Sequence, residues 1–138
     1  MIILIDTDVL IDVALDREHY AESAGTLLDA LEHRPGLAFV AWHSVSNFYY
    51  LVKPSRGRVS AKQLILDLIE FVDVAPTTTE SLRSAATMEI KDFEDAMQVA
   101  AAIACGADVI ATRNIKDYSK SPVKAVTPAA ILSMLSEH

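Results

Sequence analysis

Two aspartates of this sequence, Asp6 and Asp95, have the side-chain type and the placement of candidate ligands for a divalent metal ion. Asp6 comes directly after an apolar run at the start of the chain, and Asp95 lies just before a stretch rich in alanine. Oxygen ligands of this kind suit Mg²⁺ or Mn²⁺, which keep several waters and engage phosphate oxygens. An ion held there can activate water and polarise a phosphoryl group. The chemistry implied is hydrolysis of a phosphodiester bond.

Short apolar strands and helical patterns alternate along the chain, which is typical of an α/β domain. Residues 1–5 are apolar without alternation, as expected of a central strand that is buried on both faces of a parallel sheet. Further strands are predicted at residues 37–42, 72–75, 108–111 and 124–126. We therefore expect a three-layer α/β/α sandwich with a mostly parallel central sheet, built as a single domain over residues 1–138.

Helices are predicted between the strands, at residues 8–15, 18–32, 44–52, 60–71, 80–89 and 94–105, with a last one that opens at Thr127 and Pro128. Thr7, Ser44 and Ser60 have the side chains that favour N-cap positions. Pro54 is expected to halt the helix that starts at Ser44, and Gly106 to end the helix before it in a left-handed conformation. The helix at 94–105 contains few strongly polar residues, which indicates that it is nearly all buried.

Polar residues gather at the predicted carboxyl ends of the strands, where open parallel sheets bind their ligands. They are Asp6 and Asp8 after the first strand, His43, Ser44 and Asn47 after the second, and Thr112, Arg113, Asn114 and Asp117 after the fourth. Each alone has a structural explanation, because an Asp ahead of a helix commonly caps it and contributes about 1 kcal/mol. Asn47 likewise stands where it can serve as the capping-box partner of Ser44. Asp92 and Glu94, beside Asp95, are expected to be solvated acids of a first helical turn.

The combination of Asp6 with Asp95 is harder to explain in that way. Asp6 follows a strand buried on both faces, and Asp95 opens a helix buried nearly all round. Carboxylates brought that close repel and raise each other's pKa unless a cation neutralises them. This pair is therefore the core of the predicted divalent metal site.

Composition leaves the partner open but indicates a compartment. The net charge is −7, yet basic residues cluster in two places, at Lys53, Arg56, Arg58 and Lys62 and at Arg113, Lys116, Lys120 and Lys124. A local basic rim can coexist with an acidic whole. The single cysteine, Cys105, excludes an intrachain disulfide, and the reducing cytoplasm is the expected location. No apolar run approaches the roughly 18 residues that a membrane helix needs, so no membrane partner is expected.

Three motifs in order give a more specific interpretation. They are Ile5-Asp6-Thr7-Asp8-Val9-Leu10-Ile11-Asp12, then Asp92-Phe93-Glu94-Asp95-Ala96, then Thr112-Arg113-Asn114-Ile115-Lys116-Asp117-Tyr118. The chain resembles the PIN-domain nucleases, and most closely the VapC-type toxins of toxin–antitoxin pairs. The resemblance lies in these motifs, in the spacing between them and in the total length of the chain. The resemblance implies the PIN version of the α/β/α sandwich. It also implies an Mg²⁺- or Mn²⁺-dependent endoribonuclease that hydrolyses phosphodiester bonds in RNA, as the toxin of a type II toxin–antitoxin system.

The resemblance also assigns roles to single residues. It makes Asp6 the first metal ligand, Asp95 the third acid and Asp117 the fourth. Thr112 and Asn114 carry over as polar groups that orient ligands and substrate. Family members usually place a glutamate in the helix after the second strand, and here that position is Asn47. An amide oxygen can ligate a hard cation but brings no charge, so we expect one firm metal site and one weak, substrate-assisted site.

The predicted partners are RNA, a cognate antitoxin and a second copy of the chain. Basic side chains that neutralise phosphates would bind RNA in a salt-sensitive way, and the candidates are Arg113, Lys116, Arg56 and Arg58. Phe48, Tyr49 and Tyr50 are contiguous on a predicted helix, so they cannot all face the core. At least one is expected to serve a homodimer or antitoxin interface.

Other functions stay open on the sequence alone. Asp6-Thr7-Asp8-Val9 also fits the opening motif of haloacid-dehalogenase-type phosphatases, whose first Asp is a covalent nucleophile, although no acid pair directly follows the late strand. A receiver domain should carry its phosphoacceptor at the end of the third strand, where this chain has Ala75-Pro76-Thr77. With Asn47 uncharged, a degenerate PIN-like module that binds RNA or a partner without cutting is the remaining alternative.

Overall fold

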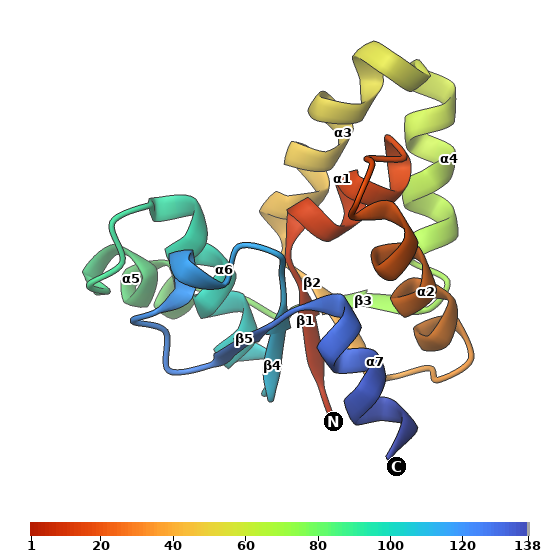
Figure 1. Ribbon diagram of the computed structural model, residues 1–138. Helices are drawn as coiled ribbons and strands as arrows, with labels where there is room; N and C mark the ends of the chain where they lie inside the picture. The colour runs from red at the N-terminus through yellow and green to blue at the C-terminus, as the bar shows by residue number, and fades with distance from the viewer. Residues whose placement is uncertain (138) are drawn as a thin grey trace.

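A five-stranded sheet forms the centre of the computed structural model, which describes residues 1–137 (Figure 1). The strands are β1 (Ile3–Ile5), β2 (Ala38–Val40), β3 (Val72–Val74), β4 (Val109–Ala111) and β5 (Lys124–Val126). They lie in the order β3-β2-β1-β4-β5, and every neighbouring pair is parallel. Each lies within a predicted strand, and the predicted α/β architecture is confirmed.

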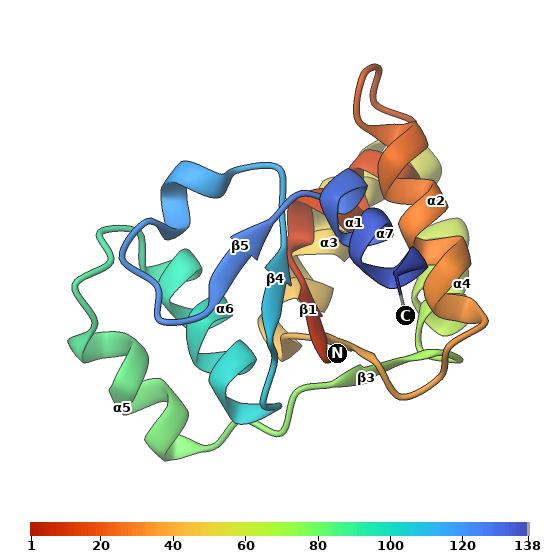
Figure 2. The ribbon, with the colours of Figure 1, turned by 60° about the horizontal axis from the view of Figure 1, so that its bottom comes forward.

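Helices cover both faces of this sheet. They are α1 (Thr7–Ala14), α2 (Ala21–Glu32), α3 (Trp42–Arg56), α4 (Arg58–Leu68), α5 (Thr79–Thr87), α6 (Phe93–Ala104) and α7 (Pro128–Ser136), with a 3-10 helix η1 (Ile115–Tyr118). Figures 1 and 2 show α5 and α6 on one side of the sheet and α1 to α4 with α7 on the other. Over the part of the chain that the structure describes, no helix has both the length and the apolar character to cross a membrane.

The central strand β1 explains why the first residues are apolar without alternation. Ile3, Leu4 and Ile5 are each completely buried. Successive side chains of a strand point to opposite faces. Ile3 and Ile5 accordingly join the cluster that contains apolar buried residues of α1, α2 and α7, whereas Leu4 joins the one that contains Val99, Ala101 and Ala102 of α6. A strand covered on both faces has no solvent side on which polar residues would be favoured.

Several helix starts differ from the prediction by a few residues, and two of these differences bear on the site. α1 begins at Thr7 and its N-cap is Asp6, whose side chain accepts a hydrogen bond from the Thr7 amide. α3 begins at Trp42, so the prediction of Ser44 as an N-cap is wrong, and so is that of Asn47 as its capping-box partner. Ser44 lies inside the helix and is completely buried. Its hydroxyl binds side chains of other elements instead of the backbone of its own helix.

The end of α3 also differs from the prediction. Pro54 does not halt the helix, which continues to Arg56 and then turns through Gly57 into α4. A proline removes one backbone N–H, and the bond it would have made is to the carbonyl of Tyr50. Tyr50 is largely exposed, so the missing bond lies on the solvent side of the helix. Gly57 has a φ of 83°, which a residue with a side chain rarely adopts, and this allows the reversal between the two helices.

Candidate active site: an acidic cleft at the carboxyl ends of the strands

A cleft of about 220 Å³ lies at the carboxyl end of β1 and is lined in part by residues of α1, α3 and α6. It is lined by Asp6, Thr7, Asp8, Ile11, Arg17, Asn47, Leu51, Glu94, Asp95 and Asn114. Of the predicted metal ligands, the fold brings Asp6, Asp95 and Asn47 to this one cavity. Asp117 is the exception, because it lines a neighbouring hollow.

Asp6 is nearly inaccessible to solvent and uses both of its carboxylate oxygens. Its Oδ1 accepts the Thr7 amide at 2.7 Å, which is the helix cap. Its Oδ2 accepts hydrogen bonds from the Tyr118 hydroxyl at 2.9 Å and the Thr112 hydroxyl at 3.0 Å. A cap explains the first oxygen only. The second is held by residues more than a hundred positions away, as expected of a carboxylate whose orientation matters to a site.

Asp8 is fixed by the loop that follows β4. Its Oδ2 accepts the Asn114 side-chain amide at 2.9 Å and the Arg113 backbone amide at 3.3 Å, and it lies 3.1 Å from the Thr112 hydroxyl. Thr112 has a single hydroxyl proton, and it lies between Asp6 and Asp8. Among the described residues, the buried Oδ1 of Asp8 has no hydrogen-bond partner. Thr112 and Asn114 therefore orient carboxylates, which is the kind of role that the resemblance implies.

The electrostatics of the cleft favour the uptake of positive charge. Burial raises the pKa of Asp6 to about 7, with further increases from the charges of Asp8 and Glu94, while the hydrogen bonds from Tyr118 and Thr112 oppose the shift. Burial also raises the pKa of Asp8, against the hydrogen bond from Thr112. Acids with raised pKa values near neutrality mark a site whose negative charge is not compensated by its own side chains.

Asp95 lies in the first turn of α6, where Asp92 caps the helix by accepting the Asp95 amide at 3.2 Å. Burial and the charges of Asp92, Glu94 and Asp117 raise the pKa of Asp95 to about 6. Asp95 lines both the acidic cleft and a hollow of about 280 Å³ next to it. Asp117 lines only that hollow, so it acts on the cleft through the charge it exerts on Asp95.

The residues of the cleft fit a hard divalent cation in their chemistry. They offer oxygen ligands, three acids with raised pKa values (Asp6, Asp8 and Asp95) and the unpartnered Oδ1 of Asp8. Within residues 1–137, no three His, Cys, Asp or Glu side chains already converge as a metal-binding group. An ion held here would therefore need waters to complete its shell, as Mg²⁺ prefers, and an adjustment of side chains less constrained than Asp6.

Several site residues were missed or misjudged from the sequence. Glu94, predicted as a solvated acid, is half-buried and accepts hydrogen bonds from His43 and Gln98. Tyr118 binds Asp6 but had no assigned role. Glu94 lies inside the second of the three sequence motifs and Tyr118 inside the third. The motifs therefore mark the site, but they do not show which of their residues take part in it. For Glu94, the available signal was Gln98, a polar residue four positions on in an otherwise apolar helix.

The four basic residues predicted to bind substrate are placed differently from one another, and none of them lines the acidic cleft. Arg56 donates from Nη1 to the carbonyl of Ala14 at 2.9 Å, at the end of α1. Arg58 is exposed at the start of α4, and Lys116 is exposed on the hollow beside Asp95.

Arg113 holds the loop after β4 against α1. Its Nε donates to Asp12 Oδ2 at 2.8 Å, and its guanidinium carbon lies 4.4 Å from the centre of the Tyr20 ring. Asp12 is only 2% exposed, and its other oxygen is 3.6 Å from Arg17. The ion pair, with a buried carboxylate and a partly exposed guanidinium, therefore joins the elements that carry Asp8 and Asn114. The substrate role of Arg113 stays a prediction.

Arg113→Ala is expected to destabilise the protein by about 2–3 kcal/mol, because it leaves the buried carboxylate of Asp12 with only the longer contact to Arg17. Urea unfolding at neutral pH measures the loss. Arg58→Ala removes the same side chain from an exposed position and should change the free energy of unfolding by less than about 0.5 kcal/mol. Equal effects of the two substitutions would show that the ion pair contributes nothing.

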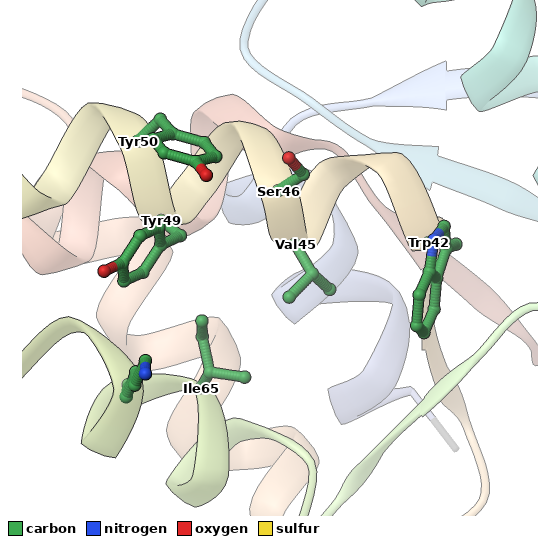
Figure 3. Close-up of a pocket in the computed structure, with 7 residues that line it drawn as sticks. Trp42, Val45, Ser46, Tyr49, Tyr50 and Ile65 are labelled. Carbon is green, nitrogen blue, oxygen red and sulfur yellow. The ribbon is translucent and has the colours of Figure 1, made fainter. Parts of the chain in front are cut away.

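A third and larger hollow, of about 620 Å³, lies between α3 and α4 and is mainly apolar (Figure 3). Trp42, Val45, Ser46, Tyr49, Tyr50, Lys62 and Ile65 line it, and we call it the α3–α4 groove. Phe48 is buried in the core, whereas Tyr50 is 66% and Trp42 75% exposed. The prediction that the three contiguous aromatic residues cannot all face the core is confirmed.

Comparison with known proteins gives one family and a set of similar folds. Residues 2–116 match a family model described as a PIN domain. Similar solved structures include VapBC2 from Rickettsia felis, bound to a DNA fragment from its promoter (15% identity, TM-score 0.71, 92% of this chain and 98% of that chain). Others are VapC20 of Mycobacterium tuberculosis, a toxin that cleaves the sarcin–ricin loop (16%, 0.63, 78% and 86%), and FitAcB from Neisseria gonorrhoeae (20%, 0.62, 92% and 98%). No curated protein matches the chain.

Proposed function

This chain belongs to the PIN-domain family, and we propose that it is an Mg²⁺- or Mn²⁺-dependent endoribonuclease that acts as the toxin of a toxin–antitoxin pair. The observation that carries the proposal is the pair Asp6 and Asp95. They come from distant parts of the sequence, share one cleft at the carboxyl ends of the strands and have pKa values of about 7 and 6. Acids arranged in this way would be stabilised in their charged form by a divalent cation.

Asp6, Asp95 and, by its unpartnered Oδ1, Asp8 are the residues that would hold the cation, with Asn47 as a neutral oxygen donor. When bound, the ion would polarise a phosphodiester group and lower the pKa of a water. The protein's own part is to prevent the carboxylates from turning away. Tyr118 and Thr112 fix Asp6, and burial raises the pKa of the Tyr118 hydroxyl, so that it stays a hydrogen-bond donor.

For the RNA backbone we propose the hollow beside the cleft. It joins Asp95 and Asp117 to the side chains of Lys91, Lys116 and Lys120. Lysines next to the acids can neutralise phosphates while the scissile group approaches Asp95, which makes binding weaker as salt rises. Of the predicted substrate contacts, Lys116 has this support. Arg58 remains a candidate on exposure alone, whereas Arg56 and Arg113 are engaged within the protein.

Purified protein is expected to cleave single-stranded RNA in Mg²⁺ or Mn²⁺, to stop in excess EDTA and to leave small phosphomonoesters intact. Gel analysis of a labelled RNA and a colorimetric phosphatase assay measure the two activities. Rapid turnover of a phosphomonoester, lost in Asp6→Asn, would favour the haloacid-dehalogenase-type alternative. RNA binding without cleavage in either metal would favour the degenerate binding module.

A cognate antitoxin is the partner that we propose for the α3–α4 groove. Two of the similar structures, VapBC2 and FitAcB, are complexes with the antitoxins VapB and FitA, which supports such a partner for this chain. The groove offers the exposed rings of Trp42 and Tyr50 beside the ammonium group of Lys62, which suits an apolar segment with an acidic residue. The protein is proposed to act in the cytoplasm, where RNA and such a partner are both present.

Trp42 is the single tryptophan of the chain, so its fluorescence reports on the groove. Its emission is expected to shift to shorter wavelength when the product of a small neighbouring reading frame is co-purified with the protein. Tyr50→Glu should abolish that co-purification. If the emission shifts instead with the protein's own concentration, and sedimentation shows a dimer that Tyr50→Glu dissociates, the groove serves the predicted homodimer.

A further inference from the structure

We propose that Glu94 is a further acid of the active site, that it supplies the negative charge which Asn47 does not, and that His43 and Gln98 position it. The inference rests on the proposed function, because it assigns Glu94 to the binding of the same divalent cation. Glu94 lines the acidic cleft together with Asp6, Asp95 and Asn47. It therefore meets the first requirement, which is to face the same cavity.

Two helices bring these side chains together across the cleft. His43 and Asn47 are four residues apart on α3, and Glu94 and Gln98 are four residues apart on α6. Residues at this spacing lie on the same face of a helix, one above the other. The two pairs meet, because His43 Nε2 donates to Glu94 Oε2 at 2.6 Å. Glu94 and Asn47 thus approach one cavity from opposite helices.

The carboxylate of Glu94 is anchored by one oxygen. Gln98 Nε2 donates to the same Oε2 at 2.9 Å, so both hydrogen bonds go to that atom and neither uses Oε1. The Gln98 amide nitrogen is itself held at 2.6 Å from the Ser44 hydroxyl and 3.1 Å from that of Thr7, the residue next to Asp6. Gln98 and Ser44 are completely buried. A buried polar network of this kind fixes an orientation because its members have few alternative partners.

A purely structural role does not explain why residue 94 is a glutamate, whose side chain is an acid. Glu94 lines the same cleft as Asp6, Asp8 and Asp95, so a negative charge on it repels the negative charges of its neighbours while the cleft holds no cation. A neutral glutamine could accept the same hydrogen bonds from His43 and Gln98 without this repulsion. An acid held next to two other acids by buried side chains is the arrangement that a bound cation would favour.

Glu94→Gln, which keeps the shape of the side chain, is expected to weaken Mn²⁺ binding at least about tenfold. Calorimetric titration with Mn²⁺ measures the affinity without any substrate or turnover. Glu22→Gln makes the same chemical change at an exposed position of α2 and should leave the affinity unchanged. Unchanged affinity in Glu94→Gln would overturn the proposal, and so would a change confined to metal-free stability.

Moving the carboxylate across the cleft gives a sharper test. In the Glu94→Gln protein, the additional change Asn47→Glu should restore Mn²⁺ affinity to within a few-fold of the wild type, because the missing charge returns to the same cavity. Circular dichroism checks that both variants are folded. If they are folded and the affinity is not restored, Glu94 acts through its own position and not through the charge that Asn47 lacks. This outcome would overturn the statement that Glu94 supplies the charge missing at Asn47.

His43 tests the positioning. His43→Ala should weaken Mn²⁺ binding about tenfold, as expected when a supporting hydrogen bond to a ligand is removed, whereas His43→Gln keeps a donor and should recover most of the affinity. Equal loss in both variants would contradict a positioning role. If the wild-type protein binds no Mn²⁺ at all, the proposed function fails together with this inference. If it binds and Glu94→Gln binds equally well, only the inference fails.

Discussion

Asp6→Asn is expected to abolish RNA cleavage and, at the same time, to stabilise the metal-free protein above neutral pH. Asp6 is 5% exposed, and burial raises its pKa to about 7 with help from Asp8 and Glu94. An amide carries no charge with which to hold a cation. The cleavage rate should therefore fall by more than about 100-fold, the upper end of the loss seen when only a supporting residue of a metal site is removed.

The stability effect has a defined pH dependence. Between about pH 4 and pH 7, the folded protein keeps a proton on Asp6 that the unfolded chain has released. The stabilisation from this group is therefore complete below its unfolded pKa and is lost as the pH rises through its folded pKa. Three pKa units correspond to an upper limit of about 4 kcal/mol. Relative to the wild type, the free energy of unfolding of Asp6→Asn should rise by about 2–4 kcal/mol from pH 4 to pH 8.

Urea unfolding in EDTA at a series of pH values measures this difference. Asp29→Asn is the matched control, because Asp29 is an exposed residue of α2. A difference between Asp6→Asn and the wild type that stays constant from pH 4 to pH 8 would show that the carboxyl of Asp6 titrates normally. A variant that cuts RNA at the wild-type rate would remove Asp6 from the site.

Mn²⁺ at 100-fold above its dissociation constant should raise the free energy of unfolding of the wild-type protein by about 2.7 kcal/mol. Asp95→Asn should remove most of that increase. Because the ion binds ionised carboxylates, it must displace protons from Asp6 and Asp95, whose pKa values are about 7 and 6. The increase should therefore be larger at pH 7.5 than at pH 5.5.

Thermal melts with and without millimolar Mn²⁺, at both pH values, check this result. Asp73→Asn, on an exposed position of the edge strand β3, should keep the full wild-type response. A wild-type melting temperature that does not change with Mn²⁺ would count against any divalent cation in the cleft. A response that persists in Asp95→Asn would place the ion elsewhere.

The sheet and the two principal acids were predictable because their signals are local. A strand that is covered on both faces must be apolar throughout, and β1 is. The carboxyl ends of parallel strands meet at one edge, so residues directly after β1 and β4 had to come together. Asp6 and Thr112 are such residues, and their side chains are hydrogen-bonded.

The errors fall where a distant partner decides the outcome. Ser44 has a good capping side chain, but its hydroxyl is used by Thr7 and Gln98, so the helix starts earlier. The contact of Arg113 with Asp12 could not be predicted for the same reason, because the two residues are far apart in the sequence. The prediction of Glu94 as a solvated acid misses the hydrogen bond from His43, a residue of α3 that is far away in the sequence.

The central place of β1 in the sheet governs when the cleft can form during synthesis of the chain. β1 is made before the other four strands of the sheet, yet Ile3 pairs with Val109, which is made much later. Pairing of segments so far apart requires a long stretch of chain to lose its conformational freedom first, and it is slow for that reason. A nascent chain therefore carries Asp6 without Asp95 or Thr112 until these residues have also been made. The cleft, and any cutting it performs, can exist only after the segment up to Thr112 has been made and has paired with β1.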